Sequence, residues 1–177
     1  MATPRAGTTR PTPHPDAPPP GTDLPRHYSG CFGCGELEGG LRLRFRTGPD
    51  LTVTGTFAVD THHQGAPGLA HGGVITAAFD EALGALQVYF REPAVTASLR
   101  TDFLRPVPVG SVLHIRTRVD GREGRKLRVS GEGRLDAPDG PLAARASALF
   151  VVVDHQHFVR HGRPAEVEAG AEVDVNP

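Results

Sequence analysis

The sequence predicts an α+β domain in which an antiparallel sheet of about six strands is covered by one long helix. Two observations support this class. Residues 71–86 are the only long segment with apolar side chains at helical spacing, whereas the other folded segments alternate apolar and polar side chains. A sheet with one apolar face needs a covering layer, and a helix of about 20 residues, roughly 30 Å long, supplies it.

The expected strands follow from this alternation and are separated by turn residues. Alternating apolar residues place them at 41–46, 51–59, 95–103, 113–119, 127–135 and 144–153. Glycine, proline and aspartate mark turns at 48–50, 106–110, 120–121 and 138–140. The first turn makes a hairpin of the first two strands, and the helix follows the second strand.

The expected helix buries one apolar stripe, and two carboxylates adjoin it. The stripe residues recur at spacings of three and four: Val74, Ile75, Ala78, Phe79, Ala82, Leu83 and Leu86. Asp80 and Glu81 follow Phe79 directly, and a carboxylate beside a buried stripe is a candidate for chemistry. The alternative is an ordinary carboxylate on the helix surface, which is the stronger interpretation for Glu81.

Length and composition favour one domain with tails. We expect residues 1–27 to form a disordered proline-rich tail, because they have too little apolar surface to offset ordering entropy. Residues 28–158 form the expected domain and 159–177 a flexible tail. The net charge of −1 gives no general attraction for nucleic acid or an anionic membrane. With no spanning segment or secretory signal in the sequence, we expect a cytoplasmic location.

Cys31 and Cys34 lie in a glycine-rich loop before the first strand. A structural zinc site needs four ligands, but no second cysteine pair exists, and His27, His62 and His63 lack the usual ligand spacing. A metal site and a redox pair are alternatives, but we expect a packed turn with buried cysteines, and no metal or cofactor. We also expect His62 and His63 to be solvated.

Three further histidines, His155, His157 and His161, lie in a weakly patterned terminal segment. We expect a solvated tail there in preference to a metal site.

The helix start carries two glycines, Gly72 and Gly73. The first amides of a helix have no intrahelical partner and lie at the positive end of its dipole, so they can hold an oxyanion. One such donor stabilises the charge that develops on a carbonyl oxygen during acyl transfer by about 3 kcal/mol. The alternative is that the glycines let the helix pack closely on the sheet.

Asp80 lies nine residues after His71, which corresponds to about 13 Å along a helix. Asp80 and the glycine amides of one chain are therefore too far apart to contact the same carbonyl group. If both act on one centre, a second subunit supplies one of them.

These residues together carry a family resemblance. The order of elements, His71-Gly72-Gly73, Asp80, Thr-Ala-Ser-Leu at 96–99 and Phe-Leu-Arg-Pro at 103–106 resembles the hotdog-fold acyl-CoA thioesterases of the phenylacetate-pathway (PaaI-like) type. The Cys-Phe-Gly-Cys-Gly segment at 31–35, followed by Gly40-Leu41, is also similar to the opening of many such proteins. The likeness covers residues 28–154.

The resemblance implies a hotdog fold, in which the sheet wraps one long central helix, and a homodimer or dimer of dimers with active sites at the dimer interface. Asp80 would act as general base or nucleophile on an acyl-CoA or related thioester. The amide of Gly72, with Gly73 beside it, would polarise the thioester carbonyl. Thr96 would help to place the water, and His71 would orient or polarise the thioester region.

Other residues are candidates for substrate binding. Gln64 precedes His71 by seven residues and is a candidate helper of the acid, as in some family members. The cations Arg105, Arg122, Arg125 and Lys126 flank turns and are candidates for the coenzyme phosphates, although a solvated hairpin is the alternative. Phe79 and Leu83 could line an acyl tunnel or simply belong to the core.

Two other functions are alternatives to the thioesterase. Hotdog hydratases usually carry an Asp with a His five residues later, but Asp60 is followed at that distance by Gly65. A non-catalytic acyl-CoA-binding module is the remaining alternative, and the presence of both Asp80 and Thr96 argues against it.

Overall fold

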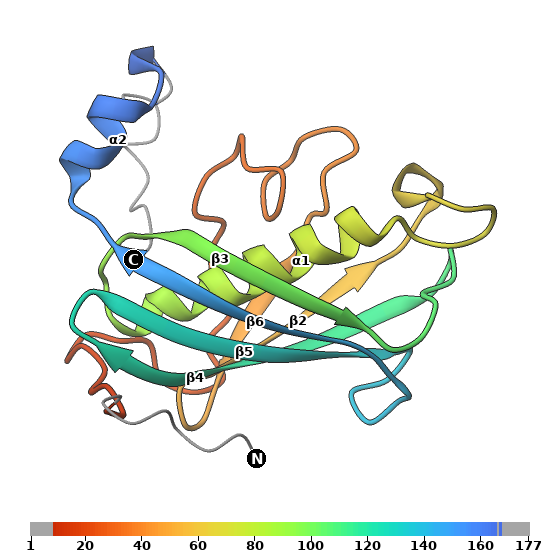
Figure 1. Ribbon diagram of the computed structural model, residues 1–177, viewed down its shortest axis with the longest axis horizontal. Helices are drawn as coiled ribbons and strands as arrows, with labels where there is room; N and C mark the ends of the chain where they lie inside the picture. Colours follow the sequence, from red (N-terminus) through yellow and green to blue (C-terminus); the bar gives the residue numbers. More distant parts are fainter. Residues whose placement is uncertain (1–8, 166, 168–177) are drawn as a thin grey trace.

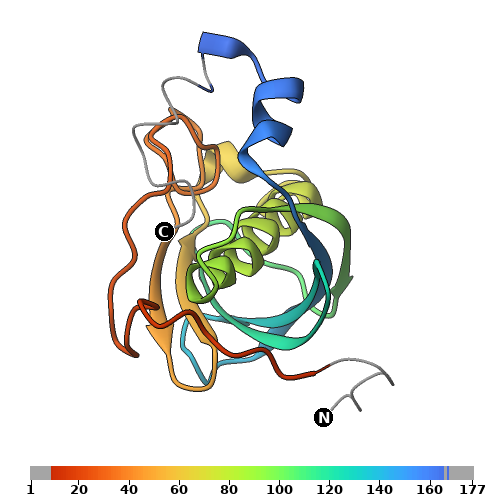
Figure 2. The same ribbon diagram turned by 90° about the vertical axis from the view of Figure 1, so that its left-hand side faces the viewer.

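A six-stranded antiparallel sheet curls around one helix in the computed structural model, which describes residues 9–165 and 167 (Figures 1 and 2). The strand order is β1-β2-β4-β5-β6-β3. The strands are β1 (Arg44–Gly48), β2 (Thr52–Ala58), β3 (Ala94–Phe103), β4 (Val112–Glu123), β5 (Lys126–Leu135) and β6 (Leu142–Val152). The predicted class and the predicted order of two strands, helix and four strands are confirmed.

The central helix α1 (Gly72–Gly84) lies in the concave side of the sheet, as the end-on view of Figure 2 shows. It is shorter than predicted, because the chain continues from Ala85 to Tyr89 as a 3-10 helix, η2. The predicted apolar stripe is buried except for Val74, which is half-buried: Ile75, Ala78, Phe79, Ala82, Leu83 and Leu86. These side chains join the two layers into one core.

Most strand boundaries lie within two residues of the prediction, and two differ by more. β1 begins at Arg44, because Arg42 has a φ of 53° and interrupts the extended chain, although Leu41 and Leu43 are still buried. The predicted turn at 120–121 is wrong, because β4 passes through a bulge there and continues to Glu123. The chain turns instead at Gly124, whose φ of 55° suits glycine.

The N-terminal segment differs from the expected disordered tail from Thr9 onward. Residues 21–24 run beside β1, where Leu24 N–H donates to Phe45 O at 2.9 Å and Thr47 N–H donates to Thr22 O at 2.9 Å. β1 is an edge strand, so its outer backbone groups need partners, and an extended segment provides them without a periodic apolar pattern. Residues 1–8 of the expected tail lie outside the described residues.

The C-terminal segment contains a second short helix, α2 (His155–His161), which projects from the domain in Figure 1. Asp154 caps it by accepting a hydrogen bond from His157 N–H at 2.9 Å. The expected domain boundary at 158 therefore falls inside a helix, and none of the helix residues is buried. Within the described residues, no helix has the length and apolar character needed to cross a membrane. Residues 166 and 168–177 of the expected tail lie outside the described residues.

We predict that Leu83→Ala lowers the free energy of unfolding by about 2–5 kcal/mol, because Leu83 is fully buried between α1 and the sheet. Leu37→Ala is the matched control. Its side chain is 44% exposed, so the same truncation should change stability by no more than about 0.5 kcal/mol. Urea denaturation followed by circular dichroism measures both values, and equal losses would contradict the assigned core.

Candidate active site

Asp80 and Thr96 meet between α1 and β3. The Thr96 hydroxyl donates a hydrogen bond to Asp80 Oδ1 at 2.8 Å. A bulge interrupts the pairing of β3 with β6 between Thr96 and Ser98, and bulges of this kind re-aim a side chain. Asp80 itself is half-buried at the margin of the apolar stripe. Two of the predicted site residues are thus brought together, and the hydroxyl orients the carboxylate.

The helix start is capped by its own histidine. His71 Nδ1 accepts a hydrogen bond from Gly73 N–H at 2.9 Å, which makes His71 the N-cap of α1. The Gly73 amide is therefore already engaged, and the expectation that it faces a substrate carbonyl does not fit this geometry. The Gly72 amide, in contrast, has no acceptor among the described residues, and it lies at the positive end of the helix dipole.

Two groups of predicted site residues lie apart along this helix. Gly72 and Asp80 are eight residues apart, or about 12 Å along the axis. β3 runs beside α1 in the opposite direction: a Cβ on Gly72 would lie 3.4 Å from the Phe103 ring, while Thr96 contacts Asp80. Within one chain, the Gly72 amide at the start of α1 is therefore separated from the Asp80 carboxylate further along the same helix.

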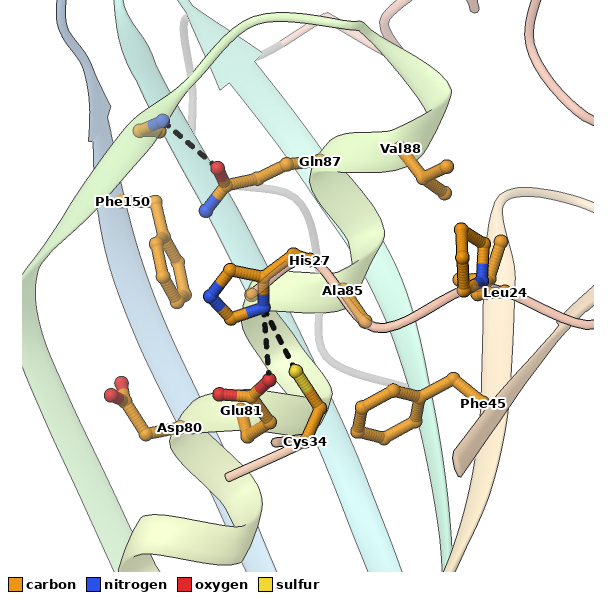
Figure 3. Close-up of a pocket in the computed structure, with 13 residues that line it drawn as sticks. Leu24, His27, Cys34, Phe45, Asp80, Glu81, Ala85, Gln87, Val88 and Phe150 are labelled. Atoms are coloured by element: carbon orange, nitrogen blue, oxygen red, sulfur yellow. Dashed lines mark hydrogen bonds and ion pairs between the residues drawn. The ribbon is translucent and has the colours of Figure 1, made fainter. Parts of the chain in front are cut away.

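A cavity of about 170 Å³ lies beside Asp80 (Figure 3). Ligand pockets usually measure about 300–1,000 Å³, so this cavity is small for a site formed by one chain alone. Its lining comes from α1 and the following turn, from the sheet, and from the N-terminal segment: Leu24, Pro25, His27, Cys34, Phe45, Asp80, Glu81, Gly84, Ala85, Gln87, Val88, Ala94 and Phe150.

The lining differs from the prediction at two places. Phe79 and Leu83, which were candidates for lining an acyl tunnel, are both 0% exposed and belong to the core. Ala85 and Val88 provide apolar surface in the cavity instead. Leu24 was missed, because the proline-rich composition of its segment predicted disorder. Its one signal in the sequence is a large apolar side chain in a segment that has few others.

A polar cluster adjoins this cavity. His27 Nδ1 lies 3.0 Å from Cys34 Sγ and 3.3 Å from Glu81 Oε1, and Cys31 Sγ lies 3.4 Å from Glu81 Oε2. Both cysteines are free. Cys34 is buried as predicted, but the expectation that the cysteines act as simple apolar side chains is wrong, because both contact ionisable groups.

These contacts shift the pKa values of the cluster strongly. Hydrogen bonds with Cys34 first and then His27 lower the pKa of the Cys31 thiol to about 3, against the opposing effect of burial. Cys31 and burial raise the pKa of the Cys34 thiol. Cys31 and Glu81 raise the pKa of His27 to about 10. The cluster therefore concentrates negative charge around one imidazole.

The loop before α1 holds two residues whose places differ from expectation. Gln64 Oε1 accepts a hydrogen bond from Gly68 N–H at 3.0 Å and so closes the loop, which is a supporting contact rather than a contact with the acid. His63 was expected to be solvated but is 4% exposed and packs edge-on against Phe57. His62 is exposed, as predicted.

The four predicted cations fall at opposite ends of the sheet. Arg105 N–H donates to Ala143 O, whereas Arg125 O accepts from Val152 N–H. Residues 143 and 152 are nine positions apart on β6, or about 30 Å. Arg122 pairs with Glu92, while Arg125 and Lys126 are exposed at the β4–β5 turn. These cations therefore do not form one phosphate site within a chain.

Comparison with known proteins gives consistent matches. A family model described as the thioesterase superfamily matches residues 67–142. Acyl-coenzyme A thioesterase THEM4 of Xenopus laevis is 39% identical over 88 residues, which cover 50% of this chain and 39% of that protein. A putative esterase of Pseudomonas aeruginosa is 32% identical over 128 residues, covering 63% of this chain and 93% of that protein.

A solved structure also shares the fold. A putative thioesterase of Ralstonia eutropha, described as a phenylacetic acid degradation-related protein, superposes with a TM-score of 0.58 and 26% identity over 64% of this chain and 87% of that one. The chain spans only 39% to 52% of the length of the matched THEM4 proteins from Xenopus laevis, Bos taurus and Rattus norvegicus.

We predict that His71→Ala lowers the free energy of unfolding by about 0.5–2 kcal/mol, because α1 loses the acceptor that caps Gly73 N–H. His71→Asn is the matched control, since its side-chain oxygen can accept the same hydrogen bond and should restore most of the loss. Urea denaturation of both variants measures the difference. Equal losses in the two variants would contradict a capping role.

Proposed function

The chain belongs to the thioesterase superfamily, and from this membership we propose that it hydrolyses an acyl-coenzyme A or related thioester to a carboxylic acid and a free thiol. The observation that carries the proposal is the hydrogen bond that Thr96 donates to Asp80, a residue that lines the cavity. A carboxylate fixed in this way can act on water or on a carbonyl carbon. The names of the THEM4 relatives support coenzyme A as the carrier of the acyl group.

Asp80 acts in one of two ways that give the same products. As a general base it removes a proton from water while the water oxygen attacks the thioester carbon. As a nucleophile it attacks that carbon itself and forms an anhydride that water then hydrolyses. In both routes the carbon–sulfur bond breaks, and the leaving thiolate takes up a proton. Thr96 is the positioning residue that orients the carboxylate.

The Gly72 amide stabilises the oxyanion. The carbonyl oxygen gains negative charge as its carbon becomes tetrahedral. A hydrogen-bond donor directed at that oxygen lowers the free energy of the transition state by about 3 kcal/mol. The amide belongs to the first turn of α1, and glycine leaves the approach to its N–H open. The His71 side chain caps the same turn and so supports the direction of this amide.

The working unit is a homodimer. β3 lies at one end of the strand order, and Phe103 and Leu104 near its end are 55% and 48% exposed. Antiparallel pairing of two β3 strands about a twofold axis sets the Phe103 end of one beside the Thr96 end of the other. Gly72 of one chain then approaches Asp80 of the second chain, which gives two complete sites per dimer.

The same dimer accounts for the divided cations. Arg105 lies at the Gly72 end of the chain, whereas Arg125 and Lys126 lie at the end that holds Thr96 and Asp80. In the dimer, the Gly72 end of one chain lies beside the Asp80 end of the other, so cations from both chains can contact the coenzyme phosphates.

The free thiols of Cys31 and Cys34 support a reducing, cytoplasmic location.

We predict that Asp80→Asn lowers kcat by at least about 100-fold, because the amide can neither accept the proton nor attack as a carboxylate. Asp139→Asn is the matched control, since Asp139 is exposed in the β5–β6 turn. Thiol release from a panel of acyl-CoA thioesters measures both. Binding of several thioesters without turnover by the wild type would replace the proposal with a non-catalytic acyl-CoA-binding module.

A further inference from the structure

We propose that His27, Cys31, Cys34 and Glu81 bind one zinc ion, which joins the N-terminal loop to the central helix beside the active site. The sequence alone favoured no metal here. In the structure, the ligand atoms of these four side chains all lie within 4.8 Å of one another. Three of the residues come from one loop, and the fourth comes from the middle of α1.

The separations of these atoms are close to those of tetrahedral coordination. Zinc bonds of about 2.3 Å to sulfur and 2.0–2.2 Å to nitrogen or oxygen place neighbouring ligand atoms about 3.3–3.8 Å apart. The contacts of His27 Nδ1 with Cys34 Sγ and Glu81 Oε1 measure 3.0 and 3.3 Å, and that of Cys31 Sγ with Glu81 Oε2 measures 3.4 Å. Small adjustments of the side chains suffice to admit the ion.

Hydrogen bonding alone leaves this arrangement poorly satisfied. Figure 3 shows one nitrogen of His27 facing both Cys34 and Glu81. That nitrogen carries either one proton or one lone pair, so it can make only one good hydrogen bond to these two groups. A single cation among the four side chains can accept one lone pair from each of them.

Charge favours a divalent cation over a proton network. Two thiols and a carboxylate converge at a site where Cys34 is 4% exposed and the Glu81 side chain 17% exposed. Partly buried anions need a compensating charge, and a divalent cation compensates a thiolate and the Glu81 carboxylate together, which one imidazolium cannot do. Thiolate and imidazole together select zinc over the hard cations magnesium and calcium.

The backbone around the site is shaped to allow the contact. A Cβ on Gly33 would lie 2.3 Å from Glu81 Oε2, so glycine is needed for the carboxylate to reach the loop. Gly33 N–H donates to Cys31 Sγ at 3.2 Å, and Gly35 N–H closes the turn on Cys31 O at 2.9 Å. The Arg44 side chain, on β1, donates a hydrogen bond from Nη1 to the Cys34 carbonyl oxygen at 2.7 Å.

Four protein ligands make this a closed, structural site. Glu81 is the residue after Asp80, and His27 and Cys34 line the cavity beside Asp80. The ion therefore fixes the loop that forms one wall of the cavity. This role is independent of whether Asp80 performs hydrolysis, so the test uses metal binding and not turnover.

The test measures metal in the full chain and its variants. We expect the chain, purified under reducing conditions without chelator, to retain about one zinc per chain by mass spectrometry. After removal of zinc with a chelator, titration with cobalt(II) should give thiolate-to-cobalt charge-transfer absorption and the ligand-field bands of tetrahedral coordination. No retained metal together with no such bands would overturn the proposal.

Matched variants assign the ligands. Glu81→Gln preserves the shape of the side chain but removes its charge, and Cys34→Ser removes a thiolate. Each should weaken cobalt binding at least about tenfold, because mutation of residues that only support the ligands of a metal site already weakens binding by that much. Glu38→Gln, which changes an exposed loop carboxylate outside the cluster, should leave binding unchanged. Circular dichroism checks that each variant folds. Unchanged cobalt binding in folded Glu81→Gln would contradict the assigned site.

Discussion

The choice of which face of the central helix packs against the sheet is the constraint on which the rest of the structure depends. Ile75, Ala78, Phe79 and Leu83 are almost fully buried against the concave sheet, and this packing sets the orientation of every other side chain on α1. Successive helical residues differ in direction by about 100°. Asp80 therefore faces β3, while its neighbour Glu81 faces the N-terminal loop.

That orientation gives two adjacent carboxylates different surroundings. Asp80 receives a hydroxyl hydrogen bond from Thr96 on a bulged strand and lies at the cavity. Glu81 meets His27 and the cysteine loop. The cavity wall is thus built from helix, sheet and N-terminal segment together. A change in helix packing would alter the acid, the cavity and the polar cluster at the same time.

Much of the fold could be predicted, because strand alternation and helical spacing are local properties of the sequence. The six strands and the buried stripe follow from these patterns, and Asp80 and Thr96 follow from the family resemblance. The N-terminal segment could not be predicted, because Leu24 gains order only by pairing with the edge strand β1. Similarly, the sequence does not determine that His71 accepts a hydrogen bond from Gly73 N–H, because this contact depends on the rotamer of the histidine.

The polar cluster was missed for a different reason. Cys31 and Cys34 were visible as a motif, but their remaining partners are His27, in a segment expected to be disordered, and Glu81, 47 residues after Cys34. No spacing rule connects a loop to a helix across an intervening hairpin. Only the folded topology brings these four residues together.

The measurement that tests the central claim most directly is complementation between two inactive variants. Asp80→Asn removes the acid, and Gly72→Val blocks the amide at the start of α1. Co-expression with two different tags allows the mixed dimer to be isolated. If each site takes Gly72 from one chain and Asp80 from the other, the mixed dimer has one intact site and about half of the wild-type activity. A mixed dimer as inactive as its parents would contradict the shared site.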